Sequence, residues 1–164
     1  MNYEDDREWS DKSISIIKQK VGPLLLNVSS FKQDAIENTD LIVLCADKLK
    51  IACRVRRFGY ALDYPNQITI RNHRTSGSKT ELDKIKDGFG DWMFYGHATK
   101  DDLDIKPWWI IDLNTIRYYS HKPEFKGKIK FDFKNNPDGT TGFIWFDITS
   151  FPPEPKLIIQ TILT

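Results

Sequence analysis

The sequence predicts an α/β fold of the α+β kind, in which a single mixed β-sheet is flanked by helices. Short apolar runs, several with alternating polar residues, recur along the chain and are typical of strands. Helical spacing near Ser10 and a capping pattern near Glu81 indicate helices before and between these runs. A length of 164 residues suits one domain, so we expect residues 1–164 to form a single domain.

The first helix is expected from Ser10, a good N-cap residue, to Val21. Its apolar positions Ile14, Ile17 and Val21 are three and four residues apart, as on one helix face. Residues 1–9 are expected to be flexible. After the Gly-Pro break at 22–23, a short helical continuation is expected through residues 24–28.

The second helix is expected to follow a polar, basic loop at residues 72–79. Ser78 and Glu81 form the Ser-x-x-Glu pattern of a capping box, in which each side chain bonds the other's backbone. The helix is predicted to continue through Lys86 and to end at Gly88, since glycine tolerates the left-handed conformation found after helices.

Residues 40–45 and 51–57 are predicted to be adjacent antiparallel strands joined by a tight loop. The second of them alternates apolar and basic residues. A turn signal at residues 135–139 indicates a C-terminal hairpin between residues 128–134 and 143–148. The other expected strands are residues 67–71, 91–97 and 107–113, the last two joined by a charged loop at 99–104.

The overall charge excludes a uniformly basic nucleic-acid binder, because the formal net charge is only +1. Cys45 and Cys53 are interpreted as small buried hydrophobes of a reducing compartment, and no Cys/His spacing indicates zinc. The acidic N-terminus has no apolar core typical of a signal peptide, and no apolar run is long enough to span a membrane. We therefore expect a cytoplasmic protein without a membrane partner.

The order helix, strand, strand, strand, helix, strand, with Asp40 opening one strand, resembles the PD-(D/E)XK nuclease superfamily. In that family an aspartate and a Glu-x-Lys motif on the neighbouring strand meet, hold Mg²⁺ and activate water against a phosphodiester. Asp40 matches the aspartate, whereas Arg54 and Arg56 stand at the glutamate and lysine positions. The resemblance implies a restriction-endonuclease-like core over residues 10–113, extended by the C-terminal hairpin over 114–164.

Arg54 departs from the family pattern, because a guanidinium offers only hydrogen-bond donors and cannot ligate a metal. Three interpretations stay open. The site is rebuilt with Glu81 and Lys84, it has become a phosphate-binding site, or the match is coincidental. In the first, the resemblance implies Asp40, Glu81 and Lys84 as catalytic residues, with Mg²⁺ bound by Asp40 and Glu81. Glu81 and Lys84 are also spaced as a surface ion pair would be.

Positive charge concentrates on two predicted strands and the loop that follows, which is typical of a groove that binds a phosphate backbone. The nucleic-acid-binding residues expected here are Arg54, Arg56, Arg71, Arg74 and Lys79. The other interpretation is an edge strand with solvated charges. Tyr60, Tyr64 and Tyr95 flank this segment as candidates for base stacking, whereas His97 is interpreted as structural or as a rim residue.

The predicted function is that of a nuclease-like protein that binds nucleic acid, with DNA favoured. The resemblance implies metal-dependent phosphodiester hydrolysis with Mg²⁺ as cofactor, in a protein of the kind carried by phages and mobile elements. The alternative is a non-catalytic interaction or inhibitor protein that docks through the Arg-rich strand and the aromatic hairpin. A homodimer or a protein partner stays open.

Overall fold

The computed structural model describes residues 3–22, 26–28, 41–43, 50–122 and 127–162. The chain divides into two compact units, Met1–Leu49 and Lys50–Thr164. Each unit is described by itself below. No helix in the described ranges combines the length and the hydropathy that a membrane crossing requires.

The first unit contains helix α1 (Tyr3–Val21) and a two-stranded antiparallel sheet of β1 (Leu26–Val28) and β2 (Leu41–Val43). The predicted helix is confirmed, but it begins at Tyr3, so Ser10 lies within it and is not its cap. The predicted helical continuation over residues 24–28 is wrong where the structure describes it, since β1 is a strand.

The second unit contains a four-stranded sheet in the order β3-β5-β6-β9. These strands are β3 (Ile51–Arg56), β5 (Trp92–Ala98), β6 (Ile105–Asp112) and β9 (Ile158–Ile162). β3 is parallel to β5, whereas β6 is antiparallel to both β5 and β9. The strands predicted at 91–97 and 107–113 are therefore confirmed as a hairpin, and β9 was not predicted.

The predicted pairing of residues 40–45 with 51–57 is wrong. β2 pairs with β1, whereas β3 pairs with β5, so the two segments lie in different sheets. The physical reason is that β5 is almost wholly buried and needs a neighbour on each side. β6 satisfies one side and β3 the other. Asp40 itself lies outside the described residues.

A separate three-stranded antiparallel sheet has the order β4-β8-β7, formed by β4 (Gln67–Arg74), β8 (Thr141–Asp147) and β7 (Phe131–Asn135). The predicted C-terminal hairpin is confirmed as β7 and β8. A mixed α/β fold is confirmed, but the single sheet is wrong. β4 pairs with β8 and not with the other strands, which gives two sheets that bury their apolar faces against each other. β4 also continues to Arg74 through a bulge, into the segment predicted as loop.

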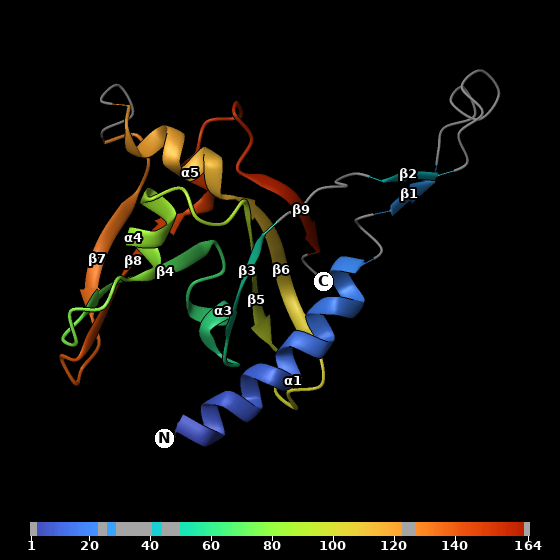
Figure 1. The fold of residues 1–164 in the computed structure, drawn as a ribbon, viewed down its shortest axis with the longest axis horizontal. Coiled ribbons are helices and arrows are strands. Elements are labelled where there is room, and N and C mark those ends of the chain that lie inside the picture. Colours follow the sequence, from blue (N-terminus) through green and yellow to red (C-terminus); the bar gives the residue numbers. More distant parts are fainter. Residues whose placement is uncertain (1–2, 23–25, 29–40, 44–49, 123–126, 163–164) are drawn as a thin grey trace. The chain divides into compact units, whose positions relative to one another are not determined.

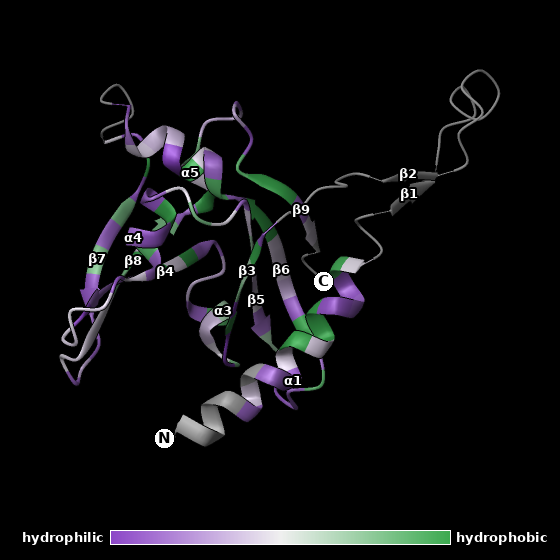
Figure 2. Cartoon of the chain, viewed as in Figure 1, coloured by the Kyte–Doolittle hydropathy of each residue, from purple (hydrophilic) through white to green (hydrophobic). Residues whose placement is uncertain are grey.

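The main core lies between these two sheets and is closed by α4 (Glu81–Lys86) and α5 (Leu113–Ser120) (Figure 1). The four-stranded sheet supplies Met93, Tyr95, Trp109 and Ile111, and the three-stranded sheet supplies Ile68, Ile70, Ile144 and Phe146. The hydrophobic stretches of β6 and β9 are visible in Figure 2, where the connection between β7 and β8 is hydrophilic to neutral. Phe94 and Trp108 are buried as well.

Helix α4 ends at Lys86 as predicted, but it begins later than predicted and has a different cap. Thr80 is the N-cap, and its hydroxyl forms a reciprocal capping box with Asp83, two residues after the predicted Ser78–Glu81 pair. The pattern Thr-x-x-Asp satisfies the same backbone groups as Ser-x-x-Glu. Because Asp83 performs the capping, the carboxylate of Glu81 is available for contacts outside the helix.

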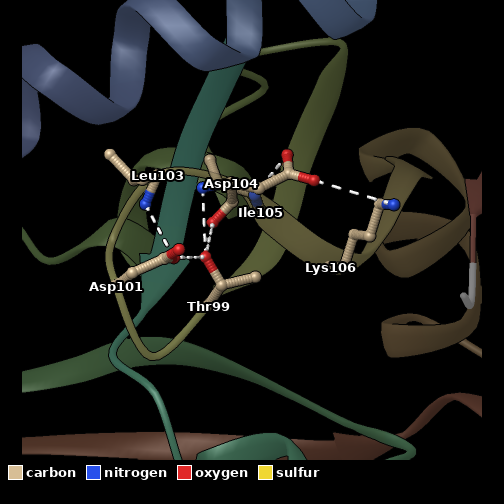
Figure 3. Close-up of polar contacts among 6 residues, drawn as sticks. All are labelled: Thr99, Asp101, Leu103, Asp104, Ile105 and Lys106. Atoms are coloured by element: carbon tan, nitrogen blue, oxygen red, sulfur yellow. Dashed lines mark hydrogen bonds and ion pairs between the residues drawn. The ribbon is translucent and has the colours of Figure 1, made fainter.

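The loop between β5 and β6 is held by its own polar side chains (Figure 3). The hydroxyl of Thr99 donates to Asp101 at 2.6 Å and accepts from the backbone N–H of Asp104 at 3.0 Å. Lys106 forms an ion pair with Asp104 at 3.7 Å. These bonds fix the end of β5 that carries His97.

Candidate functional site

Basic side chains from three elements of the second unit surround a cavity of about 270 Å³. We call it the basic pocket, lined by Cys53 and Arg54 of β3, Arg71 and Arg74 of β4, and Glu81 and Lys84 of α4. Among the described residues that line it, four cationic side chains therefore face a single carboxylate. The alternating pattern of β3 and the bulge in β4 bring the arginines together, although they are distant in sequence.

The single carboxylate of this pocket is engaged by protein groups. Arg54 Nη1 donates to Glu81 Oε2 at 2.6 Å, and the backbone N–H of Arg71 donates to the same oxygen at 3.0 Å. The side chains of the ion pair are 17% and 29% exposed, so they lie at the wall of the pocket rather than in bulk solvent. The Nε of Arg54 has no hydrogen-bond partner among the described residues. That guanidinium can still donate to an anion.

The cations of the basic pocket lie close enough to repel one another. The pKa of Arg71 is lowered, first by partial burial and then by the charges of Arg54 and Arg74, while Glu81 opposes the shift. One carboxylate therefore leaves the positive charge of the pocket incompletely balanced. A multivalent anion, such as a phosphate group, would relieve this repulsion and match the planar donors of the guanidinium groups.

The basic pocket does not fit Mg²⁺, the cofactor implied by the nuclease resemblance. Mg²⁺ requires several oxygen ligands, and the one carboxylate that the described part of the chain contributes to this pocket is already bound by Arg54. Across the described residues, no group of three or more His, Cys, Asp or Glu side chains could hold a metal ion. Asp40, the other expected ligand, lies outside those residues.

The structure brings most of the predicted site residues together. Five of them line the basic pocket, namely Arg54, Arg71, Arg74, Glu81 and Lys84. Lys79 does not line it and donates to Asp87 at 2.6 Å; this hydrogen bond, with the charge of Asp87, raises the pKa of Lys79. Arg56 lines a different cavity. Cys53, predicted to be buried, is exposed.

That second cavity, which we call the aromatic pocket, has a volume of about 220 Å³. It lies where the space between the two sheets changes from apolar to polar. Beside it, the hydroxyls of Thr69 in β4 and Tyr95 in β5 form a hydrogen bond of 3.2 Å. Its lining includes the Arg56, Tyr60, Tyr64, His97, Lys134 and Trp145 side chains. Tyr60 and Tyr64, candidates for base stacking from the sequence, are both part of it.

Arg56 stacks on an aromatic ring at this pocket. Gly59 adopts a positive φ of 99°, and the chain turns there into the short helix α3 (Tyr60–Asp63). The turn places the Tyr60 ring 4.0 Å from the guanidinium carbon of Arg56. The ammonium of Lys134 lies 5.9 Å from the ring centroid of Tyr64. Both are cation–π contacts that hold positive charge beside flat aromatic surfaces.

Two side chains of the aromatic pocket have buried polar atoms without a hydrogen-bond partner among the described residues. His97 is 2% exposed, and neither of its ring nitrogens has a hydrogen-bond partner among the described residues. The indole N–H of Trp145 is likewise buried and unpaired within that part of the chain. Burial, aided by the charge of Arg56, lowers the pKa of His97 to about 4, so the imidazole is neutral at pH 7. It offers one donor and one acceptor.

The sequence indicates a structural or rim role for His97, and it does not indicate a role for Trp145. A signal for His97 was present, since it is the one histidine in the otherwise largely apolar run of β5. For Trp145 the period-two pattern of β8 indicated only a half-buried strand. Its role depends on which residues of β4 and β5 lie opposite.

The two pockets are neighbours on the same elements. Arg54 and Arg56 are two residues apart on β3, and Thr69 and Arg71 are two residues apart on β4, so the members of each pair point to the same side of their strand. On each strand, a residue that lines one pocket therefore lies about 7 Å along the chain from a residue that lines the other. Comparisons of this chain with protein-family models, curated proteins and solved structures found no match.

Proposed function

We propose that this protein binds nucleic acid by holding backbone phosphate in the basic pocket. The observation that carries the proposal is the convergence of Arg54, Arg71, Arg74 and Lys84 on one cavity with a single, already paired carboxylate. Guanidinium groups bind phosphate oxygens through two parallel hydrogen bonds, and a cluster of them neutralises backbone charge. The modest net charge of +1 means that this local cluster, rather than the whole surface, provides the attraction.

Metal-dependent cleavage is not part of this proposal. A catalytic Mg²⁺ would need free carboxylate oxygens, whereas Glu81 accepts hydrogen bonds from Arg54 and from the backbone of Arg71. Of the three interpretations of the Arg54 departure, the arrangement favours the phosphate-binding site. DNA remains the favoured polymer, and the prediction of a PD-(D/E)XK relationship rests on the sequence order alone.

The salt dependence of binding tests the proposal. Each cation that neutralises a phosphate contributes a slope of about 0.9 in log affinity against log salt for duplex, and about 0.7 for single strands. Replacing Arg71 and Arg74 together by alanine is expected to flatten the slope by about two units on duplex. All sequences should weaken alike, because phosphate contacts carry no base information. Fluorescence anisotropy at several salt concentrations would measure this.

Helix α4 offers a matched control for that experiment. Lys84 and Lys86 are both exposed in its last turn, but Lys84 lines the basic pocket and Lys86 lines an apolar groove elsewhere. Lys84→Ala should flatten the slope by about one unit and Lys86→Ala should leave it unchanged. Equal effects of the two variants, at unchanged melting temperatures, would contradict a specific phosphate site.

Glu81→Gln separates phosphate binding from a metal-ligand role. Glutamine can still accept from Arg54 and from the Arg71 backbone, but the one negative charge of the pocket is removed. A unit charge at 4 Å in water-like surroundings is worth about 1 kcal/mol, so affinity at low salt should rise about five-fold. The control is Asp87→Asn, which removes a charge paired with Lys79 outside the pocket. If Glu81 were a metal ligand, the Glu81→Gln variant would instead lose Mg²⁺-dependent cleavage.

A protein-docking role is the second candidate, favoured by one observation. All five residues of β7 are exposed at an edge of the three-stranded sheet, and Phe131 and Phe133 are 46% and 55% exposed. Their rings adjoin an apolar groove of about 510 Å³. If the folded protein binds no nucleic acid at any salt concentration, this surface becomes the better-supported functional site.

A further inference from the structure

We infer that the aromatic pocket receives one unpaired nucleobase, whose sugar-phosphate chain is held by the neighbouring basic pocket. The inference rests on the proposed function and adds its ligand class, a nucleotide with an exposed base. Such a nucleotide occurs free or as a residue of a single strand. The two sources share the chemistry that the pocket would recognise.

The shape and lining of the pocket fit a flat ring. Tyr60 and Tyr64, 44% and 41% exposed, form its aromatic mouth, and His97, 2% exposed, forms its buried floor. An engineered apolar cavity of about 150 Å³ is large enough for benzene, so about 220 Å³ accommodates a planar heterocycle. Splayed bases in single strands stack on tyrosine rings and on arginine planes, and Arg56 with Tyr60 offers both.

The polar groups of the floor match the edge of a base. His97 supplies a donor and an acceptor, and Trp145 supplies an N–H donor; none of these atoms has a partner among the described residues. Leaving such groups unpaired in the interior is costly, so a ligand edge that pairs with them gains binding energy. No acidic side chain belongs to the described lining, and Arg56 and Lys134 are cationic. This favours an electron-rich, anionic ligand over a cation.

The separation of the pockets favours a nucleotide over an isolated ring. They share β3 and β4, and on each strand a residue that lines one pocket lies about 7 Å from a residue that lines the other. A phosphate in the basic pocket would therefore leave its own base, or that of the adjacent nucleotide, at the aromatic pocket. A base paired within a duplex cannot present its hydrogen-bonding edge to His97 and Trp145, so the inference requires an unpaired base.

The test compares single-stranded oligonucleotides with abasic strands of the same length and charge, together with free nucleoside monophosphates. Wild-type protein should bind the base-containing strand about ten-fold more tightly than the abasic strand. Tyr60→Leu should remove most of that difference, and Trp145→Phe, which keeps a ring but loses the donor, should reduce it. Tyr118→Leu is the control, because Tyr118 is equally exposed at 44% and also contacts a cation, Lys122, away from the pocket.

Each outcome decides the inference. Competition by a nucleoside monophosphate would identify the free nucleotide as an occupant, and binding of strands alone would identify a strand residue. Equal affinity for abasic and base-containing strands, with Tyr60→Leu behaving as Tyr118→Leu, would overturn the base pocket. The salt-dependent phosphate site would survive that result. If the wild-type protein binds none of these ligands, both proposals are overturned.

Discussion

Lowering the pH from 7 to 4 is expected to destabilise the folded protein by about 3 kcal/mol through His97. Burial holds the pKa of His97 at about 4 in the folded state, against 6.5 for an unperturbed histidine. Between these values the unfolded chain binds a proton that the folded protein does not. The contribution of His97 to stability is therefore present above pH 6.5 and is lost as the pH falls towards 4.

Urea unfolding of the wild type and of His97→Leu, at a series of pH values without nucleic acid, would measure this. Carboxylates also titrate in acid, but their contribution is common to both proteins and cancels in the difference. Arg56 and Lys134 are the cationic side chains of the same pocket. The free-energy difference between the two proteins should change by about 3 kcal/mol across the range. A constant difference would show that the imidazole is not desolvated.

Arg54→Ala is expected to lower the free energy of unfolding by about 2 kcal/mol, because it leaves a partly buried carboxylate without its cation. Glu81 would keep only the hydrogen bond from the Arg71 backbone. The side chains of the pair are 17% and 29% exposed, so the loss should fall below that of a fully buried pair. Denaturant unfolding of the single variants and of Arg54→Ala with Glu81→Ala forms a complete cycle.

The double variant decides the interpretation. Removing both partners leaves no uncompensated charge. The double variant should therefore lose less free energy of unfolding than the two single variants lose in sum. Strict additivity would mean that Arg54 and Glu81 are not coupled in solution. In that case Glu81 would be free for another role, including the metal ligation that the sequence predicted.

Local patterns predicted the segments that depend on local chemistry. The alternation of Ile129, Phe131 and Phe133 and the turn at residues 135–139 were enough to predict the β7–β8 hairpin. The partner of β3 could not be predicted in this way, because a strand pattern shows that a segment is extended and not which strand lies beside it. Helix α5 was missed since its aromatic and β-branched residues are weak helix formers, although Asp112 caps it by accepting from Asn114.

The sequence predicted which residues belong to the candidate site, but it did not predict the contacts between them. Arg54, Arg71 and Arg74 belong to dense basic stretches of sequence, and they do converge. The same reasoning expected Glu81 to ligate a metal, whereas the fold places it against Arg54. Whether a carboxylate meets a cation or a metal depends on side chains brought from another strand. The spacing of Glu81 and Lys84 along α4 does not indicate the contact of Glu81 with Arg54.

The order of strands in the two sheets determines when each can form. β4 is joined to β8, with Ile70 opposite Ile144, and the four-stranded sheet is closed by β9, with Trp108 opposite Ile162. Neither sheet can be completed from neighbouring stretches of chain, and such distant pairings slow folding because long loops must close first. During synthesis, β4 and β6 therefore leave the ribosome before β8 and β9, the strands that complete their sheets, have been made. Trimming the chain before Ile158 would leave β6 with an open edge.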